Sequence, residues 1–280
     1  MPKNRKNLAA FQGEPGAFSH AAARKLLGAH VDVLPCPLFT DVFRAVKEGR
    51  ATHAIVPIEN TLHGSVHENY DHLLSYEVPI AGETSIRISH QLIAMPGTRF
   101  KDVRRVYSHP VALNQCLRFF ERYPQIEKVP HYDTAGSVKT LSRERPADAA
   151  AIASKAAAEI YGGVILKRNI EDDRQNFTRF FLLNAKPEKF TGNGRRWKTS
   201  LVFATPNRPG ALFKAMACFA LRDLNLTKIE SRPLRGKPWE YLFYVDLIGH
   251  SEEPPVEHAL RNLREITTLL RVLGSYCPLD

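Results

Sequence analysis

Residues 8–28, LAAFQGEPGAFSHAAARKLLG, decide the fold of this chain. The apolar run at residues 8–11 predicts a buried strand, and the glycine- and proline-rich residues 13–16 predict a turn after it. Residues 18–27 have the pattern of a helix, which Gly28 closes. A strand, a tight turn and a helix in succession form the repeating unit of an α/β sheet.

The same alternation continues outward from this unit to about residue 183. Short apolar runs predict further strands at residues 54–56, 104–107, 126–132, 149–153 and 164–170. Helices are predicted between them, one capped by Thr40 and ended by Gly49, the others at residues 110–122, 134–141 and 154–161. The βαβα order predicts largely parallel sheets covered by helices.

Polar residues gather at four joints between strands and helices: residues 13–16, 59–61, 108–110 and 133–135. Ligands of such sheets bind at the carboxyl ends of strands, where the free N–H groups of helix starts attract anions. Caps and turns favour the same residue types, so one joint alone indicates little. Four joints at one edge predict a site for a small carboxylate.

Residues 176–180, NFTRF, close the first part of the chain. The hydroxyl of Thr178 lies between the cation of Arg179 and two aromatic rings, which is a compact way to hold an anionic, ring-shaped ligand. Alternatively, the segment is a strand whose Arg179 pairs with a surface carboxylate.

A second kind of sequence follows. Residues 187–197 hold two glycines, a proline and several basic residues, and we expect a linker there between a domain at residues 1–186 and a domain at residues 198–280. In the second domain, strands are predicted at residues 200–203, 226–231, 241–246 and 269–273. Helices are predicted after Gly210 and around Leu260. The order βαββαβ is that of the ferredoxin-like α+β fold.

Composition narrows the function classes. The net charge of +10 does not indicate nucleic-acid binding, because the basic residues are scattered among acidic ones. The four cysteines form no CxxC pair, so we expect reduced thiols in a cytoplasmic protein. No apolar run is long enough for a membrane span, and no catalytic triad, metal motif or nucleotide loop is present.

With these segments quoted, the chain resembles a prephenate dehydratase with a C-terminal regulatory ACT domain, over nearly its whole length. The resemblance rests on residues 13–19, 56–61, 108–110, 115–116, 133–135 and 176–180, and on residues 210–213 and 230–233 of the second domain. Residues 228–234 also resemble plant-type arogenate dehydratases. The chain departs from the family pattern at two places. Val111 stands where the family often has Gln, and Leu62-His63 stands where the family often has small and acidic residues.

The resemblance implies a bilobed catalytic domain like the type II periplasmic binding proteins. One lobe would hold residues 8–86 and the return through Thr178, and the other residues 90–170. It also implies the catalytic residues Thr178, Glu59, Asn60, Ser108 and Gln115. Further residues expected to bind the substrate are Arg179, Phe180, Thr61, Thr134 and Ala135.

The implied reaction converts prephenate to phenylpyruvate with loss of carbon dioxide and water, without a cofactor. Helix-start amides and Arg179 would hold the carboxylates. Thr178 would donate a hydrogen bond to the leaving hydroxyl. Glu59 is either an alternative acid or a backbone contact at the hinge. The alternatives in function are an arogenate dehydratase and a non-catalytic amino-acid sensor.

The second domain would bind L-phenylalanine as a feedback inhibitor. By resemblance, the residues that would bind it are Gly210, Ala211, Leu212, Phe213, Glu230, Ser231, Arg232 and Pro233. The site would form where the ACT sheets of two copies pair, which implies a homodimer or homotetramer. An ACT domain that only dimerises is the alternative.

Overall fold

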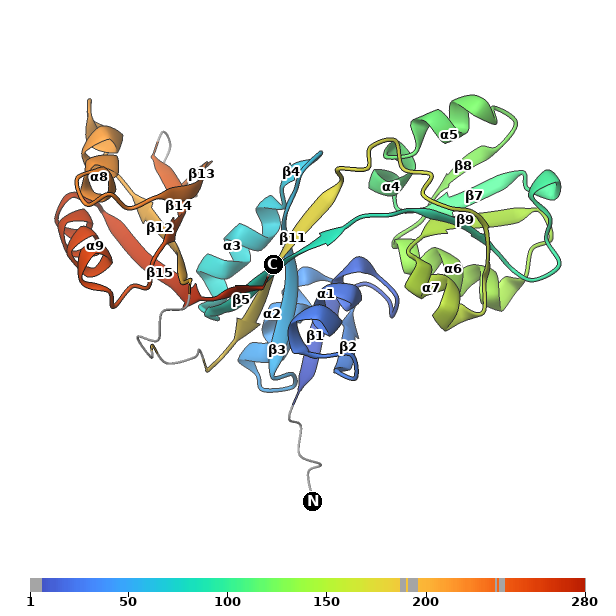
Figure 1. The fold of residues 1–280 in the computed structure, drawn as a ribbon, viewed down its shortest axis with the longest axis horizontal. Helices are drawn as coiled ribbons and strands as arrows, with labels where there is room; N and C mark the ends of the chain where they lie inside the picture. The colour runs from blue at the N-terminus through green and yellow to red at the C-terminus, as the bar shows by residue number, and fades with distance from the viewer. Residues whose placement is uncertain (1–6, 187–189, 191–195, 235, 237–239, 280) are drawn as a thin grey trace, which may run out of the picture. The chain divides into compact units, whose positions relative to one another are not determined.

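The computed structural model describes residues 7–186, 190, 196–234, 236 and 240–279. The chain divides into two compact units, one of residues 1–71 with 84–181 and one of residues 72–83 with 182–280. The helices and strands are labelled in Figure 1. Most of the linker predicted at residues 187–197 lies outside the described residues, so the predicted domain boundaries stay predictions.

The first sheet has the strand order β16-β5-β11-β3-β1-β2, and β4 pairs with β3. Its strands are β1 Leu8–Gln12, β2 Asp32–Cys36, β3 His53–Asn60, β4 Gly64–Ser65, β5 Ile80–Arg87, β11 Phe177–Asn184 and β16 Pro278–Leu279. The helices along this part of the chain are α1 Phe18–Leu27, α2 Phe39–Lys47 and α3 His67–Tyr76. The opening strand and helix are confirmed, and Gly28 ends α1 with a positive φ of 101°.

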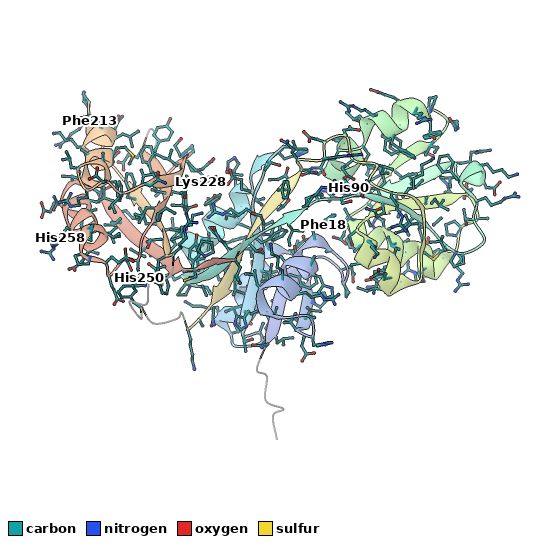
Figure 2. The ribbon with its side chains drawn as sticks, viewed as in Figure 1. Phe18, His90, Phe213, Lys228, His250 and His258 are labelled. Atoms are coloured by element: carbon teal, nitrogen blue, oxygen red, sulfur yellow. The ribbon has the colours of Figure 1, made fainter. Side chains whose placement is uncertain are left out.

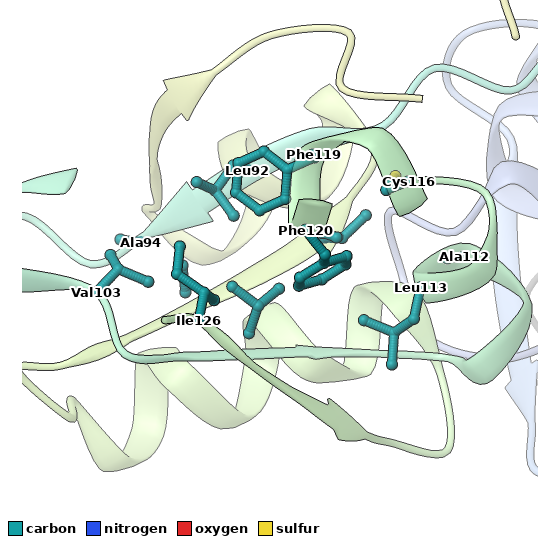
Figure 3. Close-up of a cluster of buried hydrophobic side chains, with 12 residues drawn as sticks. Leu92, Ala94, Val103, Ala112, Leu113, Cys116, Phe119, Phe120 and Ile126 are labelled. Atoms are coloured by element: carbon teal, nitrogen blue, oxygen red, sulfur yellow. The ribbon is translucent and has the colours of Figure 1, made fainter. Parts of the chain in front are cut away.

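The second sheet has the order β10-β6-β9-β7-β8. Its strands are β6 Gln91–Ala94, β7 Arg105–Ser108, β8 Glu127–Pro130, β9 Ala149–Ala153 and β10 Val164–Lys167. The helices are α4 Pro110–Asn114, α5 Leu117–Arg122, α6 Thr134–Glu144, α7 Lys155–Tyr161 and the short 3₁₀ helix η1 Phe100–Asp102. The central strand β9 is wholly buried, and Figure 3 shows the core that Phe119, Phe120 and Ile126 form beside the sheet.

The α/β fold is confirmed, but the expectation of largely parallel sheets is wrong. Strand β1 pairs parallel with β2 and β3, and β7 pairs parallel with β8 and β9. Strands β6 and β10 are antiparallel to their neighbours, as is the short strand β4. The sequence gives no signal for the direction of a strand, and β4, β5 and β6 are not among the predicted strands. The two sheets are therefore mixed.

Two predicted helix boundaries are also wrong. Thr40 does not cap α2, because the helix begins at Phe39 and its N-cap is Leu38. Leu38 and Phe39 both line the cavity described below, so packing sets this helix start.

The helix predicted at residues 110–122 is two helices, interrupted at Gln115 and Cys116. The carboxylate of Asp172 accepts hydrogen bonds from the backbone N–H groups of Leu117 (2.7 Å) and Arg118 (3.0 Å). The start of α5 is thus capped by a residue more than fifty positions away, which no local pattern reveals.

The third sheet belongs to the second unit and has the antiparallel order β13-β14-β12-β15. Its elements are β12 Lys198–Ala204, α8 Ala211–Ala220, β13 Leu226–Pro233, β14 Tyr241–Ile248, α9 Pro254–Ile266 and β15 Leu269–Tyr276. The predicted βαββαβ order is confirmed. Within the described residues, no helix has the length and apolar character that a membrane crossing requires.

Candidate active site

A cavity of about 520 Å³ lies in the first unit. This unit has two halves, one built on the first sheet and one on the second sheet, and residues of both halves line the cavity. Three of the four expected joints between strands and helices meet here: Asn60, His109, Asp133 and Thr134 line the cavity together with Thr178. Residues 13–16, the fourth joint, are not among the lining residues. Phe18 and Ser19, the first residues of α1, line it too, and Phe18 lies beside His90 (Figure 2), with 5.7 Å between the ring centroids. The start of α1 and the start of α6 therefore face one cavity.

Asn60 links the end of β3 to the strand that carries Thr178. Its Nδ2 atom donates to Oγ1 of Thr178 (2.9 Å), to Oδ1 of Asn176 (2.8 Å) and to the backbone oxygen of Phe177 (3.1 Å). Its Oδ1 atom accepts from the backbone N–H groups of residues 62 and 63, both at 3.0 Å. Because both ends of the amide are engaged, Asn60 cannot rotate without breaking the wall of the cavity.

This contact determines what the hydroxyl of Thr178 can do. One of its lone pairs accepts from Asn60, and Thr178 is only 9% exposed. An alcohol has a single O–H donor, and that donor is left to point at a ligand. A fixed and largely buried donor suits an oxygen that becomes negative during a reaction.

Alternation along β11 separates the residues of the NFTRF segment. Thr178 and Phe180 line the cavity, whereas Arg179 and Glu59 are not among its lining residues. The guanidinium of Arg179 lies 3.9 Å from the carboxylate of Glu59 and 4.8 Å from the ring centroid of Phe181. The two charged residues expected at the substrate thus face each other away from the lining, because successive side chains of a strand point to opposite faces.

Gln115 connects two histidines in the cavity wall. Its Oε1 atom lies 2.8 Å from Nε2 of His90, and its Nε2 atom lies 3.2 Å from Nδ1 of His63. His90 is 1% exposed, and burial lowers its pKa. Its backbone N–H donates to Glu171 (2.8 Å), which accepts a further bond from Arg87 (2.8 Å). The position of Gln115 is thus set by a buried hydrogen-bond network.

His109 and Asp133 stand at the starts of two helices. Nδ1 of His109 accepts from the backbone N–H of Val111 (3.3 Å), and burial lowers the pKa of His109. Oδ1 of Asp133 accepts from the N–H of Gly136 (2.6 Å), and burial raises the pKa of Asp133. These caps leave the amides of the first turn of α6, which contains Thr134 and Ala135, without partners inside the helix.

Two other expected residues hold the backbone instead of lining the cavity. Ser108 is fully buried, and its hydroxyl donates to the carbonyl of Ile152 (2.6 Å). The hydroxyl of Thr61 donates to the carbonyl of Gln175 (2.8 Å) and accepts from the N–H of Phe177 (3.0 Å). Both side chains fasten neighbouring strands of the site.

The two halves of the first unit are in close contact beside the cavity. Ser154 donates to the backbone oxygen of Gly16 (2.6 Å), and a Cβ atom on Gly16 would lie 2.7 Å from Cα of Ala157. Glu14 pairs with Lys139 (2.9 Å) and accepts from the hydroxyl of Tyr132 (3.1 Å). The glycine-rich turn is therefore the point where one half rests on the other.

The sequence analysis singled out neither His90 nor Tyr132, and it named His63 only as a departure from the family pattern. A lone histidine carries no spacing signal, and only the fold brings these rings to Gln115 and Glu14. None of the described lining residues is Lys or Arg; the ionisable ones are Glu68, Asp133, Tyr132 and three histidines. Among the described residues there is also no group of three or more His, Cys, Asp or Glu side chains that could hold a metal ion.

In the second unit, the residues expected to bind phenylalanine lie at one end of the third sheet. Strands β12 and β13 both run antiparallel to β14, so β12 ends, α8 begins and β13 ends at the same side. Gly210 is the N-cap of α8, with φ of 76°. Phe213 is 76% exposed near the start of this helix (Figure 2), and Ser231 lies on the edge strand β13. Residues 210–213 and 230–233 therefore lie at the same end of the third sheet.

Comparison with known proteins agrees with this architecture. The family described as prephenate dehydratase matches residues 9–188, and the ACT domain matches residues 199–265. Arogenate dehydratase/prephenate dehydratase 2 of Arabidopsis thaliana is 45% identical over 97% of this chain and 72% of its own length. The bifunctional chorismate mutase/prephenate dehydratase of Aquifex aeolicus (strain VF5) is 42% identical over 97% of this chain and 74% of its own length.

Two solved structures are similar over nearly the whole chain. GqqA, described as a novel type of quorum quenching acylase, has a TM-score of 0.89 and 35% identity, with 98% of this chain and 99% of that chain covered. The prephenate dehydratase of Arthrobacter aurescens in complex with L-Phe has a TM-score of 0.86 and 33% identity, with 96% of this chain and 90% of that chain covered.

Proposed function

The chain belongs to the prephenate dehydratase family, and we propose that it converts prephenate to phenylpyruvate in L-phenylalanine biosynthesis, with feedback regulation by L-phenylalanine through its ACT domain. The observation that carries the proposal is the hydrogen bond from Asn60 to Thr178 inside a cavity at the starts of α1 and α6. It leaves a single oriented hydroxyl donor where the leaving group of the substrate would bind.

In the proposed reaction, the bond between the ring and its carboxylate breaks and carbon dioxide leaves. The electron pair moves into the ring, the bond to the ring hydroxyl breaks, and the departing hydroxide takes a proton to leave as water. Aromatisation drives both steps. Thr178 donates its hydrogen bond to the departing oxygen, and a positioned donor of this kind contributes roughly 10²–10⁴-fold to the rate.

The carboxylates of the substrate bind to helix-start amides in this proposal. The first turns of α1 and α6 supply N–H groups at the cavity, including that of Thr134, whereas the next residue, Ala135, is buried and is not among the lining residues. Phe180 packs against the ring, and Gln115 acts from the opposite wall. Ser108, Thr61, Arg179 and Glu59 contribute indirectly, by holding the strands on which the lining residues stand.

Arogenate is the second candidate substrate, because the relative at 45% identity carries both activities in its name. It differs from prephenate in an amino group that replaces the keto oxygen, and its product would be phenylalanine. The structural relative described as a quorum quenching acylase makes an acylase assay a necessary third comparison.

The test is to incubate the full-length protein with prephenate and follow the alkaline absorbance of phenylpyruvate, in parallel with arogenate and phenylalanine detection. We expect turnover of prephenate, with kcat lowered roughly 10²-fold or more in the Thr178→Ala variant. Binding of either compound without turnover would make the protein an amino-acid sensor instead. Turnover of arogenate alone would assign the plant-type activity.

A homodimer or homotetramer is part of the proposal, since β13 is an edge strand of the ACT sheet with Ile229 50% exposed on it. Light scattering of the purified protein checks this. A cytoplasmic location is also a proposal. It rests on the four cysteines, none of which forms a disulfide, whereas the Arabidopsis relative is chloroplastic.

A further inference from the structure

His63 is one of the residues that line the cavity. It follows Asn60 in the chain, and its backbone N–H donates to Oδ1 of Asn60 (3.0 Å). The same amide holds Thr178, so His63 and the hydroxyl of Thr178 are fixed by one side chain. Its ring is exposed at the cavity wall, where a ligand would meet it.

The contacts of Gln115 determine which ring nitrogen of His63 carries the proton. The Nε2 atom of Gln115 is an amide NH₂ group and only donates, so Nδ1 of His63 accepts (3.2 Å). The Oε1 atom of Gln115 only accepts, so Nε2 of His90 donates to it (2.8 Å). Rotating the amide would reverse both roles, and neutral His90 would then carry its proton on Nδ1, which is buried with no hydrogen-bond partner among the described residues. The orientation with Oε1 toward His90 avoids this unsatisfied buried donor. Neutral His63 therefore carries its proton on Nε2.

The N–H group on Nε2 of His63 can bind an anionic substrate in a cavity whose described lining lacks cationic side chains of Lys or Arg. Prephenate and arogenate each carry two carboxylates, yet the described lining residues include no Lys or Arg. Recognition of the anions must then come from neutral donors, as at a helix start. We propose that His63 is a substrate-binding residue that donates a hydrogen bond from Nε2 to a carboxylate of the substrate.

The hydrogen bond from Gln115 to Nδ1 also argues against His63 as the acid of the reaction. A protonated imidazolium would carry an Nδ1–H facing the NH₂ group of Gln115, so two donors would oppose each other. A neutral imidazole is a poor proton source but a good hydrogen-bond donor, as in other enzymes that use a histidine to polarise a bound oxygen. His63 therefore acts on substrate binding, and the proton of the reaction comes from elsewhere.

This inference rests on the proposed function, and a pair of variants tests it. His63→Asn keeps a polar atom near the position of Nδ1, within reach of Gln115, but has nothing at the position of Nε2. His63→Gln reaches the Nε2 position with an amide donor. A hydrogen bond to a charged acceptor corresponds to roughly 10- to 100-fold in affinity.

We therefore expect His63→Asn to raise KM for prephenate by about 10-fold or more with kcat changed less than about 3-fold, and His63→Gln to restore KM to within about 3-fold of the parent. An unchanged KM in His63→Asn, or a loss confined to kcat, would overturn the proposal.

A second measurement is independent of turnover. Nitrogen-15 NMR of the full-length protein reports which ring nitrogen of His63 is protonated, with His63→Gln used to assign the signal. We expect the Nε2–H form, with that signal shifted when prephenate is added in excess to the slow Thr178→Ala variant. An Nδ1–H form, or no shift on saturation with prephenate, contradicts the inference. If the parent turns over neither substrate but the shift is seen, the proposed reaction fails and the binding role of His63 stands.

Discussion

At the scale of single residues, the hydroxyl of Thr178 is the group on which the proposed chemistry depends most. We predict that Thr178→Ala lowers kcat by roughly 10²-fold or more, because the donor to the leaving oxygen is lost. Thr178→Ser keeps a hydroxyl that can still accept from Asn60, so it should retain most of the activity. Steady-state kinetics with prephenate measures both.

Circular dichroism and thermal unfolding serve as the control for this pair, since the side chain is small and its removal should leave the fold intact. A Thr178→Ala variant that turns over at a rate close to the parent's would contradict the assignment. A Thr178→Ser variant as slow as the alanine variant would show that the methyl group, and hence packing, matters more than the hydroxyl.

His90 makes the stability of the protein depend on pH. Burial lowers its pKa below the ordinary value of 6.5, so below that pH the unfolded state binds a proton before the folded state does. The stabilising contribution is therefore complete above pH 6.5 and is lost as the pH falls. His109, His53 and His20 have pKa values lowered by burial in the same direction.

We predict that the free energy of unfolding by urea is smaller at about pH 5.5 than at about pH 7.5. His90→Gln, whose amide can still donate to Gln115, should show a smaller difference between the two pH values. An identical difference in the variant would mean that other groups cause the pH dependence.

At the scale of elements, the regular pattern of the sequence predicted most strands and helices, and long-range contacts explain the failures. The break between α4 and α5 comes from Asp172, which caps α5 from a distant segment. The start of α2 comes from Phe39, which packs at the cavity. Neither cause is visible in a window of neighbouring residues, whereas Gly28 and Asp133 act on their own helices and could be recognised.

The turn between β1 and α1 is an element whose shape two glycines make possible. We predict that Gly16→Ala strongly reduces activity, because the new methyl group would lie 2.7 Å from the backbone of Ala157 in the opposite half. The backbone atom cannot move aside as a flexible side chain can, so the two halves must separate and the cavity opens to water. Turnover of prephenate measures the loss.

Gly28→Ala is the matched control for this prediction. Gly28 has a similar positive φ, 101° against 94° for Gly16, but a methyl group there meets nothing within 4 Å. Both variants should lose roughly 1–2 kcal/mol of stability from the strained backbone. Only Gly16→Ala should lose activity beyond that. Equal activity in the two variants would mean that the close approach of Gly16 to Ala157 is not needed for catalysis.

At the scale of the whole molecule, residue patterns predicted the α/β part and the ferredoxin-like part, and resemblance predicted the family. The site was predicted less completely. Asn60, Gln115 and Thr178 meet in one cavity, whereas alternation along β11 turns Arg179 away from it. Which face of a strand is buried depends on the packing of the sheet, and the NFTRF segment is too short to show it. The histidines of the cavity come together only through the fold.

The reaction is expected to need neither metal nor nucleotide, because decarboxylation with aromatisation requires no electron sink outside the substrate. We predict that dialysis against EDTA leaves kcat within about 2-fold of its starting value. Loss of a catalytic group would lower kcat far more, by roughly 10²-fold at least. Activity that is abolished by EDTA and restored by a divalent ion would contradict the mechanism through Thr178.

Feedback inhibition by L-phenylalanine tests the molecule as a whole. We expect the amides at the start of α8 to hold the carboxylate of the amino acid and the exposed side chains of Leu212 and Phe213 to supply an apolar wall. Residues 230–233 are the last residues of β13 and lie at the same end of the third sheet. In a dimer, these residues of one copy can complete the site formed by the start of α8 in the other copy. Inhibition requires that phenylalanine bind more tightly to a less active arrangement, since equal affinity would shift nothing.

Gly210→Ala and Gly162→Ala are matched variants for this prediction. Both glycines have a similar positive φ, 76° and 70°, and a methyl group on either meets nothing within 4 Å. Only Gly210 begins α8, so only there would the methyl group stand where the carboxylate of phenylalanine approaches. We predict that Gly210→Ala weakens both the calorimetric binding of phenylalanine and the inhibition by roughly 10-fold, the effect of losing about 1.4 kcal/mol. Gly162→Ala should leave both unchanged, and full activity of the parent at millimolar phenylalanine without heat of binding would mean that the domain serves only for assembly.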